Sequence, residues 1–367
     1  MSQTTITKVG TASAGYVSEV AISGLIYEMP QSAEASSPYP NNRQFATAVC
    51  DGDNNLKVII WESSDGVITR VTDGSGGGAS EIAVAGLTSS DLVTAFRSAS
   101  GDLALIVWSI SQISSEASGQ QLYRVATASA GGTKGPIAVA RLSSTRFVTA
   151  LPNVEDDLIL IVWDYSNRVL TRKGSASAGG VELIELATLT SSRVVTAFPN
   201  MTNQLAMIVW DIDANGSITR RGSATGEDIK ETMAVNSLSD TRIVTSARDA
   251  DTADLRVDVW DVDANGNVHH IADASAGPID LVAGGDPQEN LFPTAVRDLT
   301  GTLQIIAWDV SSAISKAAES PPSDAIVRLA AATLLPGLKP MTFVTALEMT
   351  NDNLEVVTWH IQSESSA

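Results

Sequence analysis

Three residues near position 260 have the chemistry to bind a ligand. Asp258 interrupts the apolar run 255–260, and His269 and His270 follow shortly after it. A carboxylate in a run that should be buried destabilises the fold unless a cation or a hydrogen-bond donor accompanies it. Two interpretations are open: a local pair of Asp258 with Arg256 or a histidine, and a ligand or metal site, with Asp258, His269 and His270 as the ligand-binding candidates.

Two turns match the first half of a calcium-binding loop. DIDANG 211–216 and DVDANG 261–266 follow the pattern D-x-D-x-N-G, in which carboxylate and amide oxygens surround the cation and glycine makes the bend. The twelfth loop position is Gly222 or Ala272, where calcium needs a bidentate glutamate. Asn-Gly after Asp is also what a tight β-hairpin turn requires. We expect hairpin turns and no cofactor, with calcium as the alternative.

No catalytic motif accompanies these residues. The chain has no G-x-S-x-G elbow and no H-E-x-x-H pair, and the glycine-rich stretch 74–80 belongs to a turn type that recurs along the chain. We therefore predict that the protein is not an enzyme. Because carboxylates are abundant, hydrolysis is kept as the less favoured alternative.

The composition excludes two classes of partner. The 367 residues include 42 acidic and 23 basic side chains, for a formal net charge of −19. Nucleic acids and anionic lipid surfaces attract clustered Lys and Arg, so we expect neither as a partner. The N-terminal residues lack a secretory pattern, and no run approaches the roughly 18 apolar residues of a membrane span. We expect a cytoplasmic or non-classically exported protein without internal disulfides, since Cys50 is the single cysteine.

The elements that must position these residues follow a repeat. Seven tryptophans recur at intervals of 47, 55, 47, 50, 48 and 51 residues: Trp61, Trp108, Trp163, Trp210, Trp260, Trp308 and Trp359. A threonine precedes each by 14 residues, or by 15 in the unit of Trp260. Short β-branched runs such as LILIVW 158–163 indicate strands rather than helices. We expect the tryptophans in the core, and an exposed series that stacks on sugars is the alternative.

Each unit contains four short segments joined by turns rich in Gly, Ser, Asn and Asp. Four strands that repeat at about 50 residues are typical of propeller blades. We predict an all-β, seven-bladed β-propeller with four-stranded blades, formed by one domain of residues 1–367. Residues 6–25 match the second half of a unit and residues 343–361 match the first half. We expect these two segments to pair in one blade and to close the ring.

A basic residue recurs after each tryptophan. The series is Arg70, Arg124, Arg172, Arg220, His270, Arg328 and Lys8. We expect each cation to pair with a carboxylate near its own hairpin, drawn from Glu62, Asp164, Asp211, Asp261 and Asp309. A series of ligand-binding cations is the alternative.

Three insertions distinguish the units. Residues 27–43 separate two strands, and the distance from tryptophan to basic residue is 16 residues after Trp108 and 20 after Trp308, against 9 or 10 elsewhere. Because successive strands alternate in direction, the three insertions are predicted to project from one face of the ring. We expect this face to carry recognition, with functionless surface loops as the alternative.

The units, for example VTAFRSASGDLALIVW 93–108, resemble those of seven-bladed propeller lectins of bacteria and fungi. The resemblance covers the whole chain and implies a soluble repeat protein that binds saccharides in pockets between or on the blades. It assigns no residue of this chain to sugar binding.

Two functions follow as hypotheses. The first is a non-catalytic, lectin-like module whose repeated sites gain avidity on a glycan, and it predicts similar polar and aromatic groups in most blades. The second is a structural or scaffold subunit that docks other proteins, and it predicts one asymmetric patch on the insertion face. A propeller fold does not choose between them.

Overall fold

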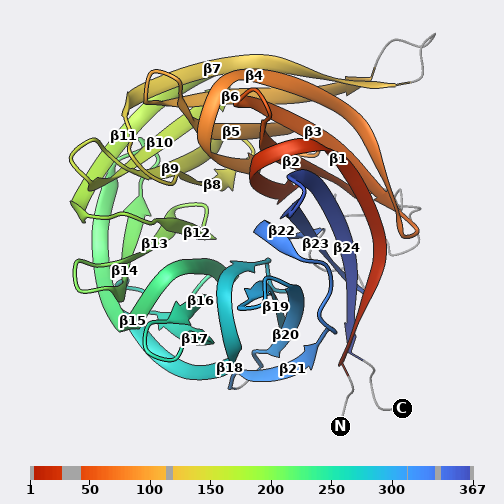
Figure 1. The fold of residues 1–367 in the computed structure, drawn as a ribbon. Helices are drawn as coiled ribbons and strands as arrows, with labels where there is room; N and C mark the ends of the chain where they lie inside the picture. Colours follow the sequence, from red (N-terminus) through yellow and green to blue (C-terminus); the bar gives the residue numbers. More distant parts are fainter. Residues whose placement is uncertain (1–3, 27–42, 113–118, 312, 335–339, 364–367) are drawn as a thin grey trace, which may run out of the picture.

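The computed structural model describes residues 4–26, 43–112, 119–311, 313–334 and 340–363, and every regular element among them is a β-strand. The strands are β1 (Thr4–Gly24), β2 (Arg43–Asp51), β3 (Asn55–Ser64), β4 (Val67–Gly86), β5 (Asp91–Ser98), β6 (Asp102–Gln112), β7 (Gln120–Gly132), β8 (Ala138–Ser143), β9 (Arg146–Pro152), β10 (Asp157–Ser166), β11 (Val169–Gly180), β12 (Glu185–Thr190), β13 (Arg193–Pro199), β14 (Gln204–Ile212), β15 (Ile218–Ser239), β16 (Arg242–Asp249), β17 (Asp254–Val262), β18 (Val268–Gly284), β19 (Leu291–Asp298), β20 (Leu303–Asp309), β21 (Ser315–Glu319), β22 (Ile326–Leu334), β23 (Met341–Met349) and β24 (Asn353–Ser363). They are arranged as a ring around a central axis (Figure 1). This part of the chain contains no helix long and apolar enough to cross a membrane.

The strands pair antiparallel into seven four-stranded sheets, which confirms the predicted all-β, seven-bladed propeller. Blade 1 contains β1–β4, blade 2 β4–β7, blade 3 β8–β11, blade 4 β12–β15, blade 5 β15–β18, blade 6 β18–β21, and blade 7 β22–β24 with β1. The long strands β1, β4, β15 and β18 each serve two blades, first as the outer strand of one and then as the inner strand of the next. Within a blade, the second strand carries the threonine and the third carries the tryptophan.

The ring closes through β1, which lies beside β24 (Figure 1). Residues 4–16 pair with β24 as the outer strand of blade 7, so the prediction that N-terminal residues complete the C-terminal blade is confirmed. The predicted grouping of residues 6–25 in that one blade is wrong at its end, because residues 17–24 pair with β2 as the inner strand of blade 1. A periodic pattern shows the length of a repeat, whereas only backbone hydrogen bonds show where one blade ends.

The seven tryptophans form the apolar centre of the blades. Each is at most 3% exposed, which confirms the core interpretation over the exposed one. Each indole N–H donates to Oγ1 of the predicted threonine, over distances of 2.9 to 3.2 Å. The extra residue between Thr245 and Trp260 lies in the hairpin turn, so Thr245 faces Asp258 just as Thr196 faces Ile208. The regular spacing therefore satisfies a buried donor in every blade.

Glycines allow three pairs of neighbouring blades to approach closely. Gly174, on the outer strand of blade 3, lies against Gly216, which makes the hairpin turn of blade 4 with a φ of 88°. A Cβ on Gly174 would overlap the Gly216 carbonyl oxygen. The same contact recurs as Gly222 with Gly266 and as Gly10 with Gly66. At the other four blade boundaries, the position of Gly174 is taken by Thr72, Ala126, Ala272 and Ala318.

The predicted insertions are only partly within the described residues. Residues 27–42 and 113–118, which hold most of the first two insertions, lie outside them. The third prediction is wrong: Trp308 faces Lys316, eight residues later, and Arg328 lies on β22 in blade 7. Lys316 thus takes the place of Arg328 in the basic series, and the turn after Trp308 is not enlarged. The sequence concealed β21 because its residues, SKAAE, include no β-branched or aromatic side chain.

Candidate functional site

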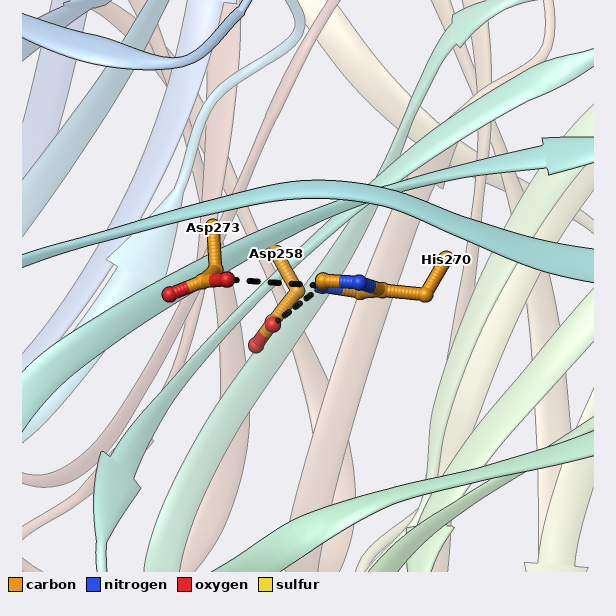
Figure 2. A group of neighbouring side chains, drawn as sticks. All are labelled: Asp258, His270 and Asp273. Carbon is orange, nitrogen blue, oxygen red and sulfur yellow. Dashed lines mark hydrogen bonds and ion pairs between the residues drawn. The ribbon is translucent and has the colours of Figure 1, made fainter.

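Asp258 lies on β17, the third strand of blade 5, where the other blades have isoleucine or valine. Its side chain is 9% exposed and is directed at His270 on the outer strand β18 (Figure 2). The distance from His270 Nε2 to Asp258 Oδ1 is 2.9 Å, and Arg256 Nε donates to both carboxylate oxygens at 3.1 Å. Asp273 lies at the edge of this cluster, 4.0 Å from His270 Nε2. The expected local pair is confirmed, with Arg256 and His270 both as partners.

Burial dominates the electrostatics of the Asp258 cluster. It raises the pKa of Asp258, while the charge of Arg256 and the hydrogen bond with His270 act in the opposite direction. His270 also packs edge-on against Trp260, with ring centres 4.8 Å apart and an interplanar angle of 71°. The cluster therefore has a partner for its buried charge and is fixed by a core aromatic ring.

The same cluster offers three atoms that a divalent metal ion could use. One atom each from Asp258, His270 and Asp273 lies within 4.8 Å of the others. However, Arg256 Nη2 also lies 3.9 Å from Asp273, so a guanidinium already supplies positive charge to both carboxylates. At the equivalent place in blade 1, Lys57 and Arg70 pair with Asp73 beside the apolar Ile59. These contacts favour a structural ion cluster over a metal site.

His269 does not belong to this cluster. Adjacent residues on a strand point to opposite faces, so His269 diverges from His270. It stands opposite Asp261 and lines a groove at the end of the ring where the first and third turns of the blades lie. The structure thus brings Asp258 and His270 together and places His269 in a different environment.

At this end of the ring, three successive blades set an arginine opposite an aspartate. The pairs are Arg146 with Asp164, Arg193 with Asp211, and Arg242 with Asp261. Their Nε–Oδ1 distances are 2.6, 2.7 and 2.8 Å. The hydrogen bond from Arg193 holds the pKa of Asp211 below its usual value, and Arg146 has the same effect on Asp164.

These pairs correct the expected partners of the basic series. Arg220 faces Trp210, whereas the adjacent Asp211 points to the other side of the sheet and pairs with Arg193 and Arg221. Members of the series have other contacts: Arg70 pairs with Asp73, and the Arg124 guanidinium lies 5.5 Å from the ring centre of Trp108. Strand alternation placed the cations and the hairpin carboxylates on opposite faces.

In blades 3 and 4, the paired arginine also binds the next blade. Arg146 Nη1 and Nη2 donate to the main-chain carbonyls of Asp213 and Ala214, at 3.0 and 2.9 Å. Arg193 makes the same two bonds with Asp263 and Ala264, at 3.0 and 3.1 Å. Both acceptor pairs come from D-x-D-x-N-G turns, so these turns lock neighbouring blades together.

The D-x-D-x-N-G turns have the contacts of hairpin turns. Asp213 Oδ1 accepts hydrogen bonds from the N–H groups of Asn215 and Ser217, each 2.8 Å long. These bonds, with that from Ser217 the largest cause, lower the pKa of Asp213. The carboxylate of Asp211 forms ion pairs with Arg193 and Arg221. The oxygens that calcium would need therefore have other partners, which favours the hairpin interpretation.

Arg242 is the exception among the three arginines. In blade 6, Ser311 stands where blades 4 and 5 have Asp213 and Asp263, the first residue of each D-x-N-G turn, and the next position, residue 312, lies outside the described residues. Within the described residues, the side chain of Arg242 makes one hydrogen bond, from Nε to Asp261 Oδ1 over 2.8 Å. Its side chain is 35% exposed, against 19% for Arg146 and 16% for Arg193.

The space left beside Arg242 is a groove of about 580 Å³ between blades 5 and 6, which we call the blade 5/6 groove. Its polar lining includes Arg242, Asp261, Asp263, His269, Glu289 and Asn290. An equivalent hollow of about 360 Å³ lies beside Arg193 in blade 4. The hollow beside Arg193 is thus the smaller of the two.

The sequence contained a signal for these arginines that the repeat analysis missed. Arginine stands three residues before the threonine in RFVT 146–149, RVVT 193–196 and RIVT 242–245, and aspartate follows the tryptophan in the same three units. The two positions face each other across antiparallel strands. A comparison of the units position by position identifies the arginine–aspartate pair. It does not show which of the three arginines also binds the next blade.

Known structures share this fold. The WD40 domain of coronin from Toxoplasma gondii is similar with a TM-score of 0.66 and 9% sequence identity, over 99% of this chain and 87% of that chain. A protein from Lactobacillus plantarum is similar with a TM-score of 0.53 and 14% identity, over 82% of this chain and 84% of that chain. At these identities the likeness concerns the WD40-like propeller fold alone. No protein-family model and no curated protein sequence matches the chain.

Proposed function

We propose that this propeller is a non-catalytic, lectin-like recognition module that binds saccharides on the face of the ring formed by the first and third turns of its blades. The blade 5/6 groove is the observation that supports the proposal. It combines a guanidinium, three carboxylates, an imidazole and an amide in a space of about 580 Å³, which suits a sugar residue.

The chemistry of the groove matches hydroxyl groups. Arg242 and Asn290 supply hydrogen-bond donors, and Asp261, Asp263 and Glu289 supply acceptors. A sugar hydroxyl both donates and accepts, so it satisfies either kind of group. All seven tryptophans are buried, so this recognition rests on polar contacts rather than on stacking against them.

Binding at a single polar groove of this kind is weak, which makes the second hollow relevant. The hollow beside Arg193 has a related lining in the adjacent blade and opens on the same face. A glycan that reaches both places gains affinity by avidity. This arrangement is less regular than the equal sites in most blades that the sequence hypothesis requires.

A glycan array screened with the purified chain tests the proposal. The array is run in calcium and again in a chelator, with two variants alongside. Asn290→Trp fills the blade 5/6 groove, and Asp251→Trp places the same ring on an exposed hairpin at the opposite end of the ring.

We expect selective binding in both buffers, loss of binding with Asn290→Trp, and unchanged binding with Asp251→Trp. A blank array in both buffers would overturn the saccharide proposal and favour the scaffold alternative. Binding that survives Asn290→Trp would also contradict it, because the ligand would then sit elsewhere.

A further inference from the structure

We propose that Arg242 is the primary ligand contact of the blade 5/6 groove and that it selects neutral saccharides with two adjacent free hydroxyls. This inference rests on the proposed saccharide function and specifies its ligand class. It follows from three arginines in equivalent positions, of which two bind the hairpin turn of the next blade and the third makes no such bond within the described residues.

The two satisfied arginines show what the third lacks. Arg146 uses Nε and Nη2 on its aspartate, and Nη1 and Nη2 on two consecutive carbonyls of the next blade. Arg193 repeats all four bonds. A guanidinium has five N–H donors in a fixed planar arrangement, and we call its two terminal nitrogens, Nη1 and Nη2, the fork. In both blades the fork donates to two consecutive main-chain carbonyl oxygens.

Arg242 presents the same fork to a groove. In the described part of the chain its side chain makes one hydrogen bond, from Nε to Asp261, which keeps the guanidinium in place. Arg242 lines the blade 5/6 groove, and Ser311, which stands at the position of Asp213 and Asp263, accepts no hydrogen bond from it among the described residues. The fork is therefore positioned for two neighbouring acceptor oxygens of a ligand.

A hairpin turn of the kind that binds Arg146 and Arg193 is not the ligand that we expect at Arg242. Those turns belong to blades 4 and 5, and the glycine of each packs against Gly174 or Gly222 of the preceding blade. Glycine is required at these two positions, since a Cβ would overlap the carbonyl oxygen of the turn glycine. The equivalent residue in blade 5 is Ala272, which faces Val259 as Gly222 faces Val209. A turn placed as in blades 4 and 5 would meet the Ala272 methyl group, so we infer that a smaller ligand fits better than a peptide turn.

The charge of the groove distinguishes between small ligands. The carboxylates of Asp261, Asp263 and Glu289 line the groove together with the guanidinium of Arg242. Hydrogen bonds from Asn267, through its side chain and then its backbone, lower the pKa of Asp263, so this carboxylate stays ionised at neutral pH. Like charges repel an acidic sugar, whereas a neutral sugar donates its hydroxyl protons to the carboxylates. Two adjacent hydroxyls of such a sugar offer the pair of oxygens that the fork binds.

Isothermal titration with simple sugars tests the inference. The probes are the methyl glycosides of mannose, glucose, galactose and fucose, and sodium glucuronate as the acidic counterpart of glucose. The variants are Arg242→Lys, which keeps the charge and removes the planar guanidinium, and Arg146→Lys, the same change at an arginine whose terminal nitrogens bind the hairpin turn of blade 4.

We expect Arg242→Lys to weaken the binding of the best neutral glycoside at least tenfold and to leave the thermal unfolding midpoint almost unchanged. Arg146→Lys should leave this binding unchanged and lower the thermal unfolding midpoint, since it removes hydrogen bonds between blades 3 and 4. Glucuronate should bind the unmodified chain at least tenfold more weakly than methyl glucoside, and Asp263→Asn should reduce that difference.

The outcomes separate this inference from the proposed function. If the chain binds a neutral glycoside and Arg242→Lys binds it equally well, the role of Arg242 is wrong while the lectin-like function stands. Tighter binding of glucuronate than of methyl glucoside would overturn the predicted ligand class. If none of the glycans on the array and none of these sugars binds, the proposed function itself fails.

Discussion

Trp210 Nε1 donates a hydrogen bond of 3.0 Å to Oγ1 of Thr196, across the second and third strands of blade 4. Both residues are buried, and the threonine hydroxyl in turn donates to the carbonyl of Ile208, at 3.5 Å. The tryptophan and threonine of every other blade are joined in the same way. The pair links the packing of a large aromatic ring to the pairing of two strands.

Removing the acceptor should therefore destabilise the fold. We expect Thr196→Val, which has nearly the same shape, to lower the free energy of unfolding by about 1–3 kcal/mol, because the buried indole N–H then has no partner. Urea unfolding measures the change. Thr196→Ser keeps the hydroxyl and serves as the control. A Thr196→Val variant as stable as the natural chain would show that the hydrogen bond contributes little.

The contact between Gly174 and Gly216 predicts a strong position effect for alanine. Gly174→Ala forces a methyl group against a backbone carbonyl of the next blade and should lower stability by about 1–3 kcal/mol. Gly179→Ala, five residues along the same strand, meets no atom within 4 Å and should have little effect. Thermal unfolding of the two variants compares them directly. Equal stability of both would contradict the close approach of blades 3 and 4.

The Asp258 cluster predicts that a double substitution is better tolerated than a single one. Asp258→Ile restores the residue of most other blades but leaves Arg256, which is 24% exposed, without its main partner. We expect this single variant to lose about 1–3 kcal/mol. Arg256→Ala with Asp258→Ile reproduces the Ala206 and Ile208 of blade 4 and should be as stable as the natural chain or more so, because an apolar pair avoids the desolvation of buried charges. Urea midpoints that fall further in the double variant would refute this account.

Glu185, the first residue of the inner strand of blade 4, predicts a pH dependence of stability. Burial raises its pKa from 4.5 to about 7, so the folded state holds the proton more tightly than the unfolded state does. The contribution of this group is therefore most favourable below pH 4.5 and is lost as the pH rises through about 7.

Glu185→Gln, which is neutral at every pH, isolates this effect. It should raise the thermal unfolding midpoint at a pH well above 7 and change it little in mild acid. Glu182→Gln, at an exposed neighbouring position, should show no such difference. A shift for Glu185→Gln that is the same at both pH values would mean that the carboxyl is solvated in the folded protein.

The sequence by itself determined the class of fold and much of the core. The spacing of tryptophan and threonine predicted the blades because each repeat must satisfy the same buried indole nitrogen, and the buried Asp258 predicted a partner because an isolated carboxylate there would be too costly. The N-terminal half-unit predicted the ring closure, since an unpaired edge is unfavourable.

The tertiary structure decided what depends on the neighbouring blade. Strand alternation separated His269 from His270, and the hydrogen bonds of β1 and the register of β21 moved the ends of two blades from their predicted places. Arg193 and Arg242 stand in nearly identical local sequence, yet Arg193 binds two carbonyls of the next blade, whereas Arg242 makes no such bond within the described residues and lines a groove. A repeat pattern encodes contacts within a blade, whereas the candidate site arises between two blades that differ, and only their packing brings those residues together.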